Sequence, residues 1–327
     1  MIIIFLFYFI FILWLFDLSN RNKKSDLDTY INQDIIINHS GDIKDLLITL
    51  DSIKSQNYKL TKINLIIFNF SNDDVKSIVD IYKNIFFKIN VIKSNNFEHR
   101  DYYLDLDENI ISGDQILIIK SGMILSSNLI QQLLNSFFQS DKTILLLPVS
   151  YNCIYRKDIF FQLFDSFLTS LKFSFINKGI YSQLDLYNDC FAIKKDTFIN
   201  TISHGEKETN FTFQYILDSN VYINQQSISK TTFTGIKFFY IIYMIINFLF
   251  LIVISTFIIN PSINLLLMIL MKIVPEIIYI YSYYNKLKIK FPKMDFLIYL
   301  IIVPFYIFIL IFNNRELVFN RFGFNRL

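Results

Sequence analysis

The sequence has few of the residues that form metal centres, disulfides and tight turns. Among 327 residues there are 2 cysteines, 3 histidines, 7 glycines and 5 prolines. Cys153 and Cys190 lack the spacing of a metal-binding pair, and His39, His99 and His204 stand singly. The pattern gives no indication of a zinc site and favours free cytosolic thiols.

Net charge is also small, at +3, which does not support a nucleic-acid-binding function. The chain is 53% hydrophobic yet 18% charged, a combination typical of a protein that lies partly in lipid and partly in water. Scarce glycine and proline, with abundant isoleucine, asparagine and lysine, indicate drift toward AT-rich codons. Only long apolar runs are therefore interpreted as membrane segments.

The first such run extends from Ile2 to Phe16. It lacks a basic start and a cleavage site of small residues, so it predicts an uncleaved signal anchor over residues 1–18. The run is short for the roughly 20 residues of a span, a difference that tilt or bilayer thinning can cover. Arg21, Lys23 and Lys24 follow it, which predicts that the next domain is cytoplasmic.

Residues 238–312 form a second membrane region, predicted to hold two or three helices before a basic tail at 313–327. Its apolar runs extend over Phe238 to Ile259, Leu265 to Tyr284 and Phe296 to Phe312. Lys272 and Glu276 interrupt the middle run four residues apart, where they could form an internal ion pair. A kinked or interfacial helix is the alternative, and the arginines of the tail leave the side of the C-terminus open.

Between them, residues 26–237 alternate short apolar runs with longer helix-like stretches, which is typical of an α/β sheet layered by helices. Four strands are expected, over Gln33 to Asn38, Asn64 to Phe70, Lys88 to Ile92 and Gln115 to Ile119. A helix is expected near Asp101 to Ile111. Nucleotides bind such sheets at the carboxyl ends of the strands, so Asn38, Asp42, Asn69, Asp73 and Lys120 are the candidate binding residues.

Several segments together resemble the family 2 glycosyltransferases of the GT-A fold, in particular the membrane-anchored bacterial type. They are DIIINHSGDIKDLLITLDSIKSQNY, LIIFNFSNDD, GDQILIIKSGMILSSNLIQQLL, LLLPVSY with FFQLFDSFL, and NDCFAIKKDTF. The match extends from the N-terminal anchor to about Phe239. It implies a GT-A-like nucleotide-binding sheet with all-α transmembrane segments at both ends.

The resemblance also implies a function. Members of the family transfer a sugar from a nucleotide-diphosphate donor to an acceptor hydroxyl, with Mg²⁺ or Mn²⁺ held by a D-x-D motif and a carboxylate as base. For this chain it implies a hexosyltransferase type of activity on a cell-envelope or lipid-linked acceptor. The implied location is the bacterial inner (plasma) membrane, in a multi-pass protein.

The sequence departs from the family pattern at its chemical centre. Lys120, Ser121 and Gly122 stand where the D-x-D motif is expected, so the metal ligands are missing. Asn69 and Phe70 replace acidic residues of the uracil-binding turn, with Asp73 the nearest acid remaining. Glu208 is the best candidate for the catalytic base and Glu206 the second, although a solvated acid beside Lys207 explains Glu208 equally well.

Three hypotheses remain open. In the first, the chain is an active transferase in which the Lys120 ammonium replaces part of the cation's charge at the diphosphate; a solvated loop lysine is the alternative. In the second, it is a catalytically inactive pseudoenzyme that serves as a membrane scaffold or partner subunit. In the third, it is a membrane protein with an unrelated α/β domain. Asp105 and Asp107 form another D-x-D string, interpreted as a solvated helix face.

Overall fold

The computed structural model describes most of the chain. Described are residues 1–16, 31–40, 42–70, 74–93, 106, 108–139, 142–147, 149–152, 156–177, 190–204, 213–215, 221–224, 237–287, 290–296 and 298–300. The chain divides into two compact units. The helical unit comprises Met1–Ser19, Cys153–Tyr181 and Thr231–Leu327, and the sheet unit comprises Asn20–Asn152 and Ser182–Lys230.

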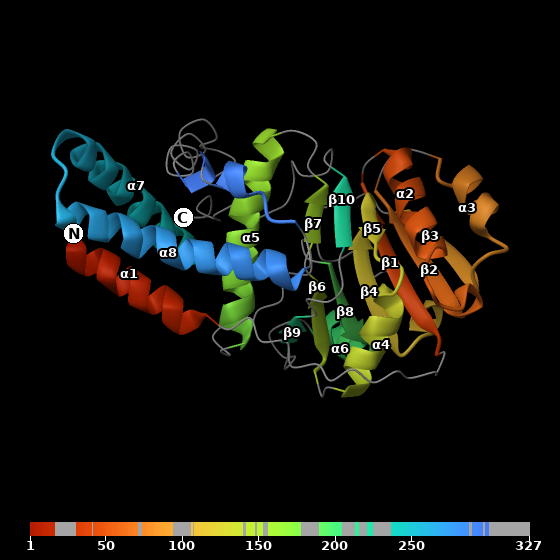
Figure 1. Ribbon diagram of the computed structural model, residues 1–327. Helices are drawn as coiled ribbons and strands as arrows, with labels where there is room; N and C mark the ends of the chain where they lie inside the picture. The colour runs from red at the N-terminus through yellow and green to blue at the C-terminus, as the bar shows by residue number, and fades with distance from the viewer. Residues whose placement is uncertain are drawn as a thin grey trace, which may run out of the picture. The chain divides into compact units, whose positions relative to one another are not determined.

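The sheet unit contains a seven-stranded mixed sheet with the order β3-β2-β1-β4-β8-β6-β9 (Figure 1). The first four strands are parallel, whereas β8 runs antiparallel to both β4 and β6. Strands are added on one side of β1 up to β3, and β4 then pairs with its other side, so β1 and β4 form a topological switch point. The strands are β1 (Gln33–His39), β2 (Ile63–Asn69), β3 (Lys88–Lys93), β4 (Gln115–Lys120), β6 (Ile144–Leu147), β8 (Cys190–Lys194) and β9 (Phe213–Tyr215).

The core of this sheet lies on β1 and β2, in which every residue is buried. Ile35, Ile36 and Ile37 are consecutive and fully buried, as expected of a parallel strand covered on both faces. Helix α2 (Ile43–Lys54) connects β1 to β2 and α3 (Lys76–Tyr82) connects β2 to β3. Such crossovers are what parallel pairing requires.

A second sheet of three strands, in the order β5-β10-β7, belongs to the same unit. Its first strand follows β4 after a two-residue turn, so the chain leaves the large sheet at the end of β4. The elements not yet bounded are β5 (Met123–Leu125), β7 (Val149–Asn152), β10 (Val221–Asn224), α4 (Leu129–Gln139), α6 (Lys195–His204), η1 (Leu60–Lys62) and η3 (Glu108–Ile110).

The expected mixed α/β sheet layered by helices is confirmed, and each of the four expected strands forms within one residue of its expected bounds. The helix expected near Asp101 to Ile111 lies mostly outside the described residues. Within the described part, a 3-10 turn over Glu108–Ile110 is found instead of an α-helix. Directly after this turn, Asn64 and Asp34 bind the backbone at Ile110, Ser112 and Gly113.

Four helices of the helical unit are α1 (Ile2–Leu15), α5 (Arg156–Asn177), α7 (Lys237–Ile259) and α8 (Ile263–Lys286). Helix α8 packs against each of the other three, and α5 crosses it (Figure 1). The Lys272 side chain reaches Phe250, and Glu276 reaches Tyr243 and Tyr8. Because residue numbers rise along α8 as they fall along α7, these two helices are antiparallel.

The inclusion of α5 in the helical unit was not anticipated. The domain predicted over residues 26–237 includes this helix. In the structure, Cys153–Tyr181 clusters instead with the two ends of the chain. Phe167 is fully buried and packs its ring against those of Tyr243 and Tyr279. Phe167 therefore serves core packing of the helical unit.

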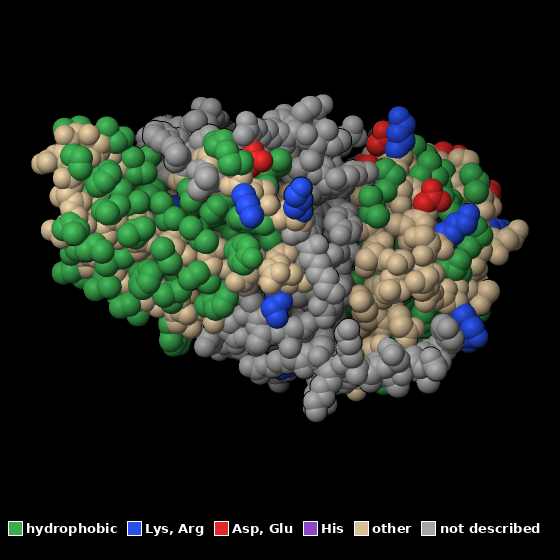
Figure 2. Space-filling model, in the orientation of Figure 1, with side chains coloured by type: hydrophobic (Ala, Val, Ile, Leu, Met, Phe, Trp, Pro, Cys, Tyr) green, Lys and Arg blue, Asp and Glu red, His purple; other side chains and the backbone are tan. Residues whose placement is uncertain are grey.

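The exterior of the helical unit is apolar. Large hydrophobic side chains are exposed along α1, α7 and α8, among them Phe7 (71%), Ile258 (74%) and Ile263 (75%), and Figure 2 shows hydrophobic side chains densely covering this unit's visible face. Of the described helices, Ile263–Lys286 is long and apolar enough to cross a membrane, and Ile2–Leu15 and Ile245–Ile259 are shorter apolar helices. Spans at both ends of the chain stay predictions.

Candidate functional site

The first candidate site lies at the carboxyl edge of the large sheet, where β1, β2 and β4 end side by side. Asn38 is paired in register with Lys120, and His39 is paired with Asn69. Neighbouring strands lie about 4.8 Å apart, so the ends of these three strands form one continuous edge. The structure therefore places Asn38, Asn69 and Lys120, three of the residues expected at a nucleotide site, at one edge of the sheet.

Alternation along the strands distributes these residues over two faces of the sheet. Asn38 and Lys120 are register partners and share one face, while His39 and Asn69 share the other. Asn38, His39 and Asn69 are buried, at 4%, 0% and 6% exposure, and Lys120 is half-buried. Lys120 is thus the cation at this edge that is best placed to reach a ligand in solvent.

The turn after Lys120 is fixed by helix α2. The backbone N–H of Gly122 donates to the Asp45 carbonyl and to the Thr49 hydroxyl, both at 2.9 Å. Gly122 has φ +88°, a conformation that side chains with a Cβ rarely adopt. A Cβ built there would lie 3.6 Å from Asp45 Oδ1. A carboxylate at position 122 would therefore face the Asp45 carboxylate at close range.

Two acidic side chains at the start of α2 lie near this turn. Asp42 is the N-cap and its Oδ1 accepts a hydrogen bond from the Lys44 N–H at 3.0 Å, so its carboxylate serves the helix end. Burial raises the pKa of the Asp45 carboxyl above its ordinary value of 3.8; the neighbouring Asp42 raises it further, and His39 opposes both. Asp45 is therefore a carboxylate in an unfavourable place for a negative charge.

The edge does not fit the divalent cation that the resemblance implies. Lys120, Ser121 and Gly122 provide no carboxylate, and a metal ion at this turn would meet the lysine ammonium. Among the described residues there is no group of three His, Cys, Asp or Glu side chains that could hold a metal ion.

The remaining expected site residues lie outside the described residues: Asp73, Glu206 and Glu208. The two expected base candidates therefore stay predictions, as does Asp73 at the uracil-binding turn. Asp105 and Asp107 also lie outside the described part of the chain.

Sequence reasoning missed two residues of the edge, His39 and Asp45. His39 is the last residue of β1, and it was treated only as one of three isolated histidines. Its position directly after a run of buried isoleucines was the available signal, since the strand end is where ligands bind. Asp45 carried no signal, because its relation to Gly122 depends on a helix folding back beside β4.

The Gln56-Asn57-Tyr58 element, which ends the first segment of the resemblance, has a structural role here. The Gln56 amide donates to the Ser52 and Ser126 carbonyls at 3.2 and 2.8 Å and accepts from the Ile130 N–H at 3.3 Å. The Tyr58 hydroxyl donates to the carbonyl of Ile31. The element therefore ties the end of α2 to the start of α4 and to the chain before β1, which fixes the helix that supports Gly122.

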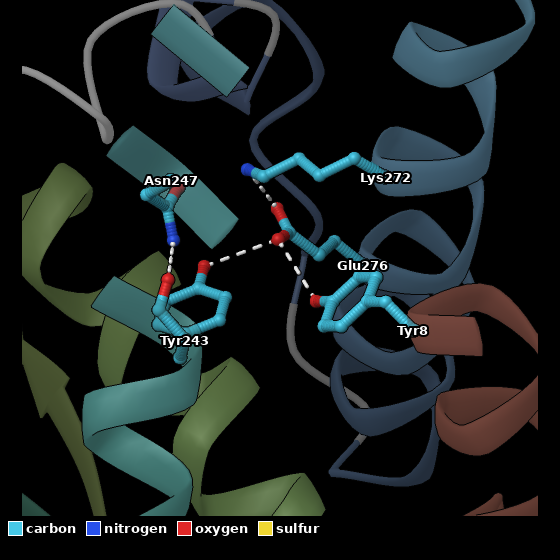
Figure 3. Close-up of polar contacts among 5 residues, drawn as sticks. All are labelled: Tyr8, Tyr243, Asn247, Lys272 and Glu276. Atoms are coloured by element: carbon cyan, nitrogen blue, oxygen red, sulfur yellow. Dashed lines mark hydrogen bonds and ion pairs between the residues drawn. The ribbon is translucent and has the colours of Figure 1, made fainter. Parts of the chain in front are cut away.

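The second candidate site is a buried polar cluster in the helical unit, formed by side chains of α1, α7 and α8 (Figure 3). Lys272 Nζ and Glu276 Oε2 lie 2.9 Å apart, and both side chains have 0% exposure. This confirms the expected internal ion pair, within a helix that continues through Pro275. The Glu276 carboxylate also accepts hydrogen bonds from the hydroxyls of Tyr8, at 3.3 Å, and Tyr243, at 3.1 Å.

Aromatic rings surround the lysine of this pair. Lys272 Nζ lies 4.7 Å from the centroid of the Phe250 ring and 6.0 Å from that of Tyr243, distances at which a ring face attracts a cation. Asn247, one turn beyond Tyr243 on α7, is buried and donates to the Tyr243 carbonyl at 2.8 Å. The cluster is thus enclosed by protein and open to no solvent.

Comparison with known proteins identifies structural neighbours only. No family model matches the chain, and no curated protein matches it. A mannosyltransferase, PcManGT from Pyrobaculum calidifontis, solved with GDP-Man and Mn²⁺, is similar over 87% of this chain and 80% of its own, with 8% identity and a TM-score of 0.46. TarS 1-349 from S. aureus, solved with UDP-GlcNAc, is similar over 81% of this chain and 78% of its own, with 12% identity and a TM-score of 0.43.

A further S. aureus TarS structure matches 37% of this chain at 16% identity, with a TM-score of 0.32, and the match covers 22% of the TarS chain. Of these neighbours, PcManGT is a mannosyltransferase, and TarS 1-349 was solved with UDP and with UDP-GlcNAc. Identities of 8 to 16% with TM-scores below 0.5 do not establish a shared activity.

Proposed function

We propose that the chain is a membrane-bound, glycosyltransferase-like protein of the GT-A type whose sheet unit binds a nucleotide-diphosphate sugar. The observation that carries this proposal is the switch point between β1 and β4, with Asn38 and Lys120 in register at its carboxyl end. Ligands of open α/β sheets bind at that place. The acceptor, a hydroxyl of a cell-envelope or lipid-linked molecule, is part of the same proposal.

Lys120 is the residue that we expect to face the diphosphate. Its ammonium stands at the end of β4, where the family resemblance implies a metal ligand, and it can offset negative charge on a departing diphosphate. Glu208, with Glu206 as second choice, is proposed to take the proton from the acceptor hydroxyl. The amides of Asn38 and Asn69 can donate to and accept from the polar edges of a nucleoside.

The bilayer is proposed to hold the helical unit, with the sheet unit on the cytoplasmic side of the plasma membrane. Support comes from the apolar exterior of α1, α7 and α8 and from α8 itself, the described helix that is both long and apolar enough to cross a membrane. Helix α8, with 24 residues, is about 36 Å long, enough for the roughly 30 Å hydrocarbon core.

Calorimetry of the detergent-solubilised full chain tests this function. UDP-GlcNAc and GDP-mannose are titrated in EDTA and, separately, with Mn²⁺. We expect binding of a nucleotide sugar that persists in EDTA, and a loss of about tenfold or more in affinity on Lys120→Ala, because a charge-assisted hydrogen bond contributes about 1.5–3 kcal/mol.

Lys62→Ala is the matched control, because Lys62 is exposed and immediately precedes β2 at the opposite edge of the sheet. It should leave the affinity unchanged. Equal losses in the two variants, or binding by neither the variants nor the original protein, would contradict the proposal.

A catalytically inactive scaffold or partner subunit is the second candidate. It is favoured by the Lys120-Ser121-Gly122 turn, in which Gly122 is tied to α2 and the space beside it is taken by Asp45. This candidate predicts a folded protein that binds no nucleotide sugar, and it predicts that Glu208→Ala is without effect in any assay of sugar transfer.

A further inference from the structure

The Glu276 carboxylate binds three different partners with its two oxygens. Oε2 accepts from Lys272, four residues earlier on the same helix, at 2.9 Å. Oε1 accepts from the hydroxyls of Tyr8 on α1 and Tyr243 on α7. One oxygen thus pairs with the Lys272 ammonium on the same helix, and the other accepts from one phenol on each of the two helices α1 and α7 (Figure 3).

A buried carboxylate in a helical bundle needs such partners. The backbone N–H groups of a helix interior are already bonded within the helix, so only side chains can satisfy it. Desolvation of two charges usually offsets most of their attraction, which makes a buried ion pair a poor source of net stability but a strong determinant of which partners fit. Any packing of the three helices that separates Glu276 from Lys272 or from the phenols is penalised.

We propose that the Lys272–Glu276 pair is an interhelical lock that docks the N-terminal helix α1 and helix α7 onto α8. Two further contacts follow the same interface: the Tyr279 hydroxyl donates to the Ile12 carbonyl at 3.0 Å, and the rings of Phe16 and Tyr279 meet edge to face at 5.0 Å. The inference does not depend on nucleotide binding by the sheet unit.

The lock has a consequence for the architecture, because α1 and α7 are separated by more than 200 residues of sequence. The chain passes from α1 into the sheet unit, returns to the helical unit at α5, enters the sheet unit again and finally returns to α7. Holding both helices on Glu276 therefore joins the first entry into the sheet unit and the last exit from it at one bundle. The lock also predicts an order of assembly. The Lys272–Glu276 pair forms together with α8, and α1 docks afterwards onto Glu276, whose charge is already paired with that of Lys272.

The single tryptophan of the chain provides a direct probe of α1. Trp14 lies near the end of α1 and is partly covered, at 57% exposure, so the tryptophan emission of the chain comes from this helix alone. The test is SDS-driven unfolding of the full chain in detergent micelles, followed by Trp14 emission and, in parallel, by far-UV circular dichroism for the whole protein.

Single variants should be worse than the double variant. Lys272→Met leaves a buried carboxylate without its cation and Glu276→Gln leaves a buried ammonium without its anion, so each should weaken the docking equilibrium seen by Trp14 roughly a hundredfold or more. The double variant Lys272→Met/Glu276→Gln is neutral and keeps an oxygen for both phenols. It should recover at least about tenfold over either single variant.

Tyr8→Phe isolates the contact from α1. It should move the Trp14 transition to lower SDS by about tenfold in equilibrium constant, with a smaller change in the circular dichroism signal. Tyr281→Phe is the control, since Tyr281 is on the same helix as Glu276 and is 53% exposed. If Tyr8→Phe leaves the Trp14 transition at its original position, or the double variant is no better than the worse single one, the lock is refuted. Should the single variants not accumulate, Tyr8→Phe and the double variant decide the matter.

Discussion

Among the described residues, each unit buries one carboxylate completely, and the two are stabilised by different means. Asp34, in β1 of the sheet unit, accepts from the Gly113 and Ser112 N–H groups at 2.6 and 3.3 Å, from the Ser112 hydroxyl at 3.2 Å and from the Asn64 amide at 2.6 Å. Glu276, in the helical unit, is held by an ammonium and two phenols.

The difference follows from where backbone N–H groups are available. A strand end and the loop beside it leave amides free to donate to a side chain, so Asp34 is satisfied by neutral donors. Inside a helix the amides are used by the helix itself, and Glu276 must find its donors on other side chains. The buried carboxylate of the sheet unit thus depends mainly on backbone and amide donors, and that of the helical unit on charged and phenolic side chains in an apolar surrounding.

The exterior surfaces provide the largest expected contrast. Leu270 on α8 and Ile81 on α3 are exposed at 45% and 68%. If the helical unit lies in lipid, Leu270→Lys places a charge in hydrocarbon, at about 2.5–3.5 kcal/mol, while Ile81→Lys faces water and changes stability by less than about 0.5 kcal/mol. The effect of Leu270→Lys is measured as retention in the membrane fraction after alkaline carbonate extraction. The effect of Ile81→Lys is measured by thermal unfolding of the purified protein. Equal behaviour of the two variants would show that both surfaces face water.

Substitution of Asp34 is the next largest effect. Asp34→Asn replaces an acceptor oxygen with an amide that faces the donors of the 112–113 loop, so we expect a loss of about 2 kcal/mol in unfolding free energy. Denaturant unfolding followed by circular dichroism gives the value. Asp74→Asn is the control, because Asp74 is exposed and accepts only near the start of α3. If Asp34→Asn is no worse than the control, the amides are not what stabilises this buried carboxylate.

A phenol–carboxylate pair occurs in both units, and in the sheet unit it lies near water. Tyr82 donates to Asp51 Oδ1 at 2.6 Å, and burial together with this bond raises the pKa of Tyr82 to about 12. The folded state therefore retains the proton where the unfolded chain has lost it. Stability from this bond is complete below about pH 10 and is lost as the pH rises toward 12.

Tyr82→Phe should cost about 1 kcal/mol at pH 8 and remove this alkaline dependence. The effect is measured as the urea midpoints of both proteins between pH 8 and pH 12, at constant ionic strength. Parallel curves over the whole range would mean that the bond does not hold the proton.

The smallest expected effect concerns Asp45. Among the described residues, its carboxylate has neither amide donors like those that bind Asp34 nor an ammonium like the one that binds Glu276. Its raised pKa means that the unfolded chain loses the proton first, so rising pH lowers stability until the folded carboxyl has also ionised. Asp45→Asn should therefore raise the thermal midpoint slightly at pH 7. The gain should vanish as the pH falls below 3.8, and a gain that is unchanged in acid would contradict this account.

Local patterns were sufficient for the first four strands. Consecutive isoleucines in Gln33–His39 and Ile63–Asn69 indicate strands covered on both faces, and the residues after them mark the edge where Asn38, Asn69 and Lys120 meet. The ion pair was also predictable, since Lys272 and Glu276 are one helical turn apart. These features depend on neighbours within a few residues, so their information is contained in short segments.

The rest was decided by tertiary structure. Nothing local in 153–181 distinguishes a helix of the sheet unit from one that packs with the ends of the chain, because burial of Phe167 against Tyr243 and Tyr279 depends on residues far away in sequence. The contact of Gly122 with Asp45, and the arrival of Tyr8 and Tyr243 at Glu276, depend on long-range packing in the same way.

Short segments of the sequence were thus enough to predict the first four strands, the residues at their ends and the ion pair within α8. The tertiary structure decided which elements form a unit and which side chains share a site. The physical reason is that strand and helix formation follow periodicities of two and 3.6 residues, whereas a shared site requires chain segments distant in sequence to be buried against one another.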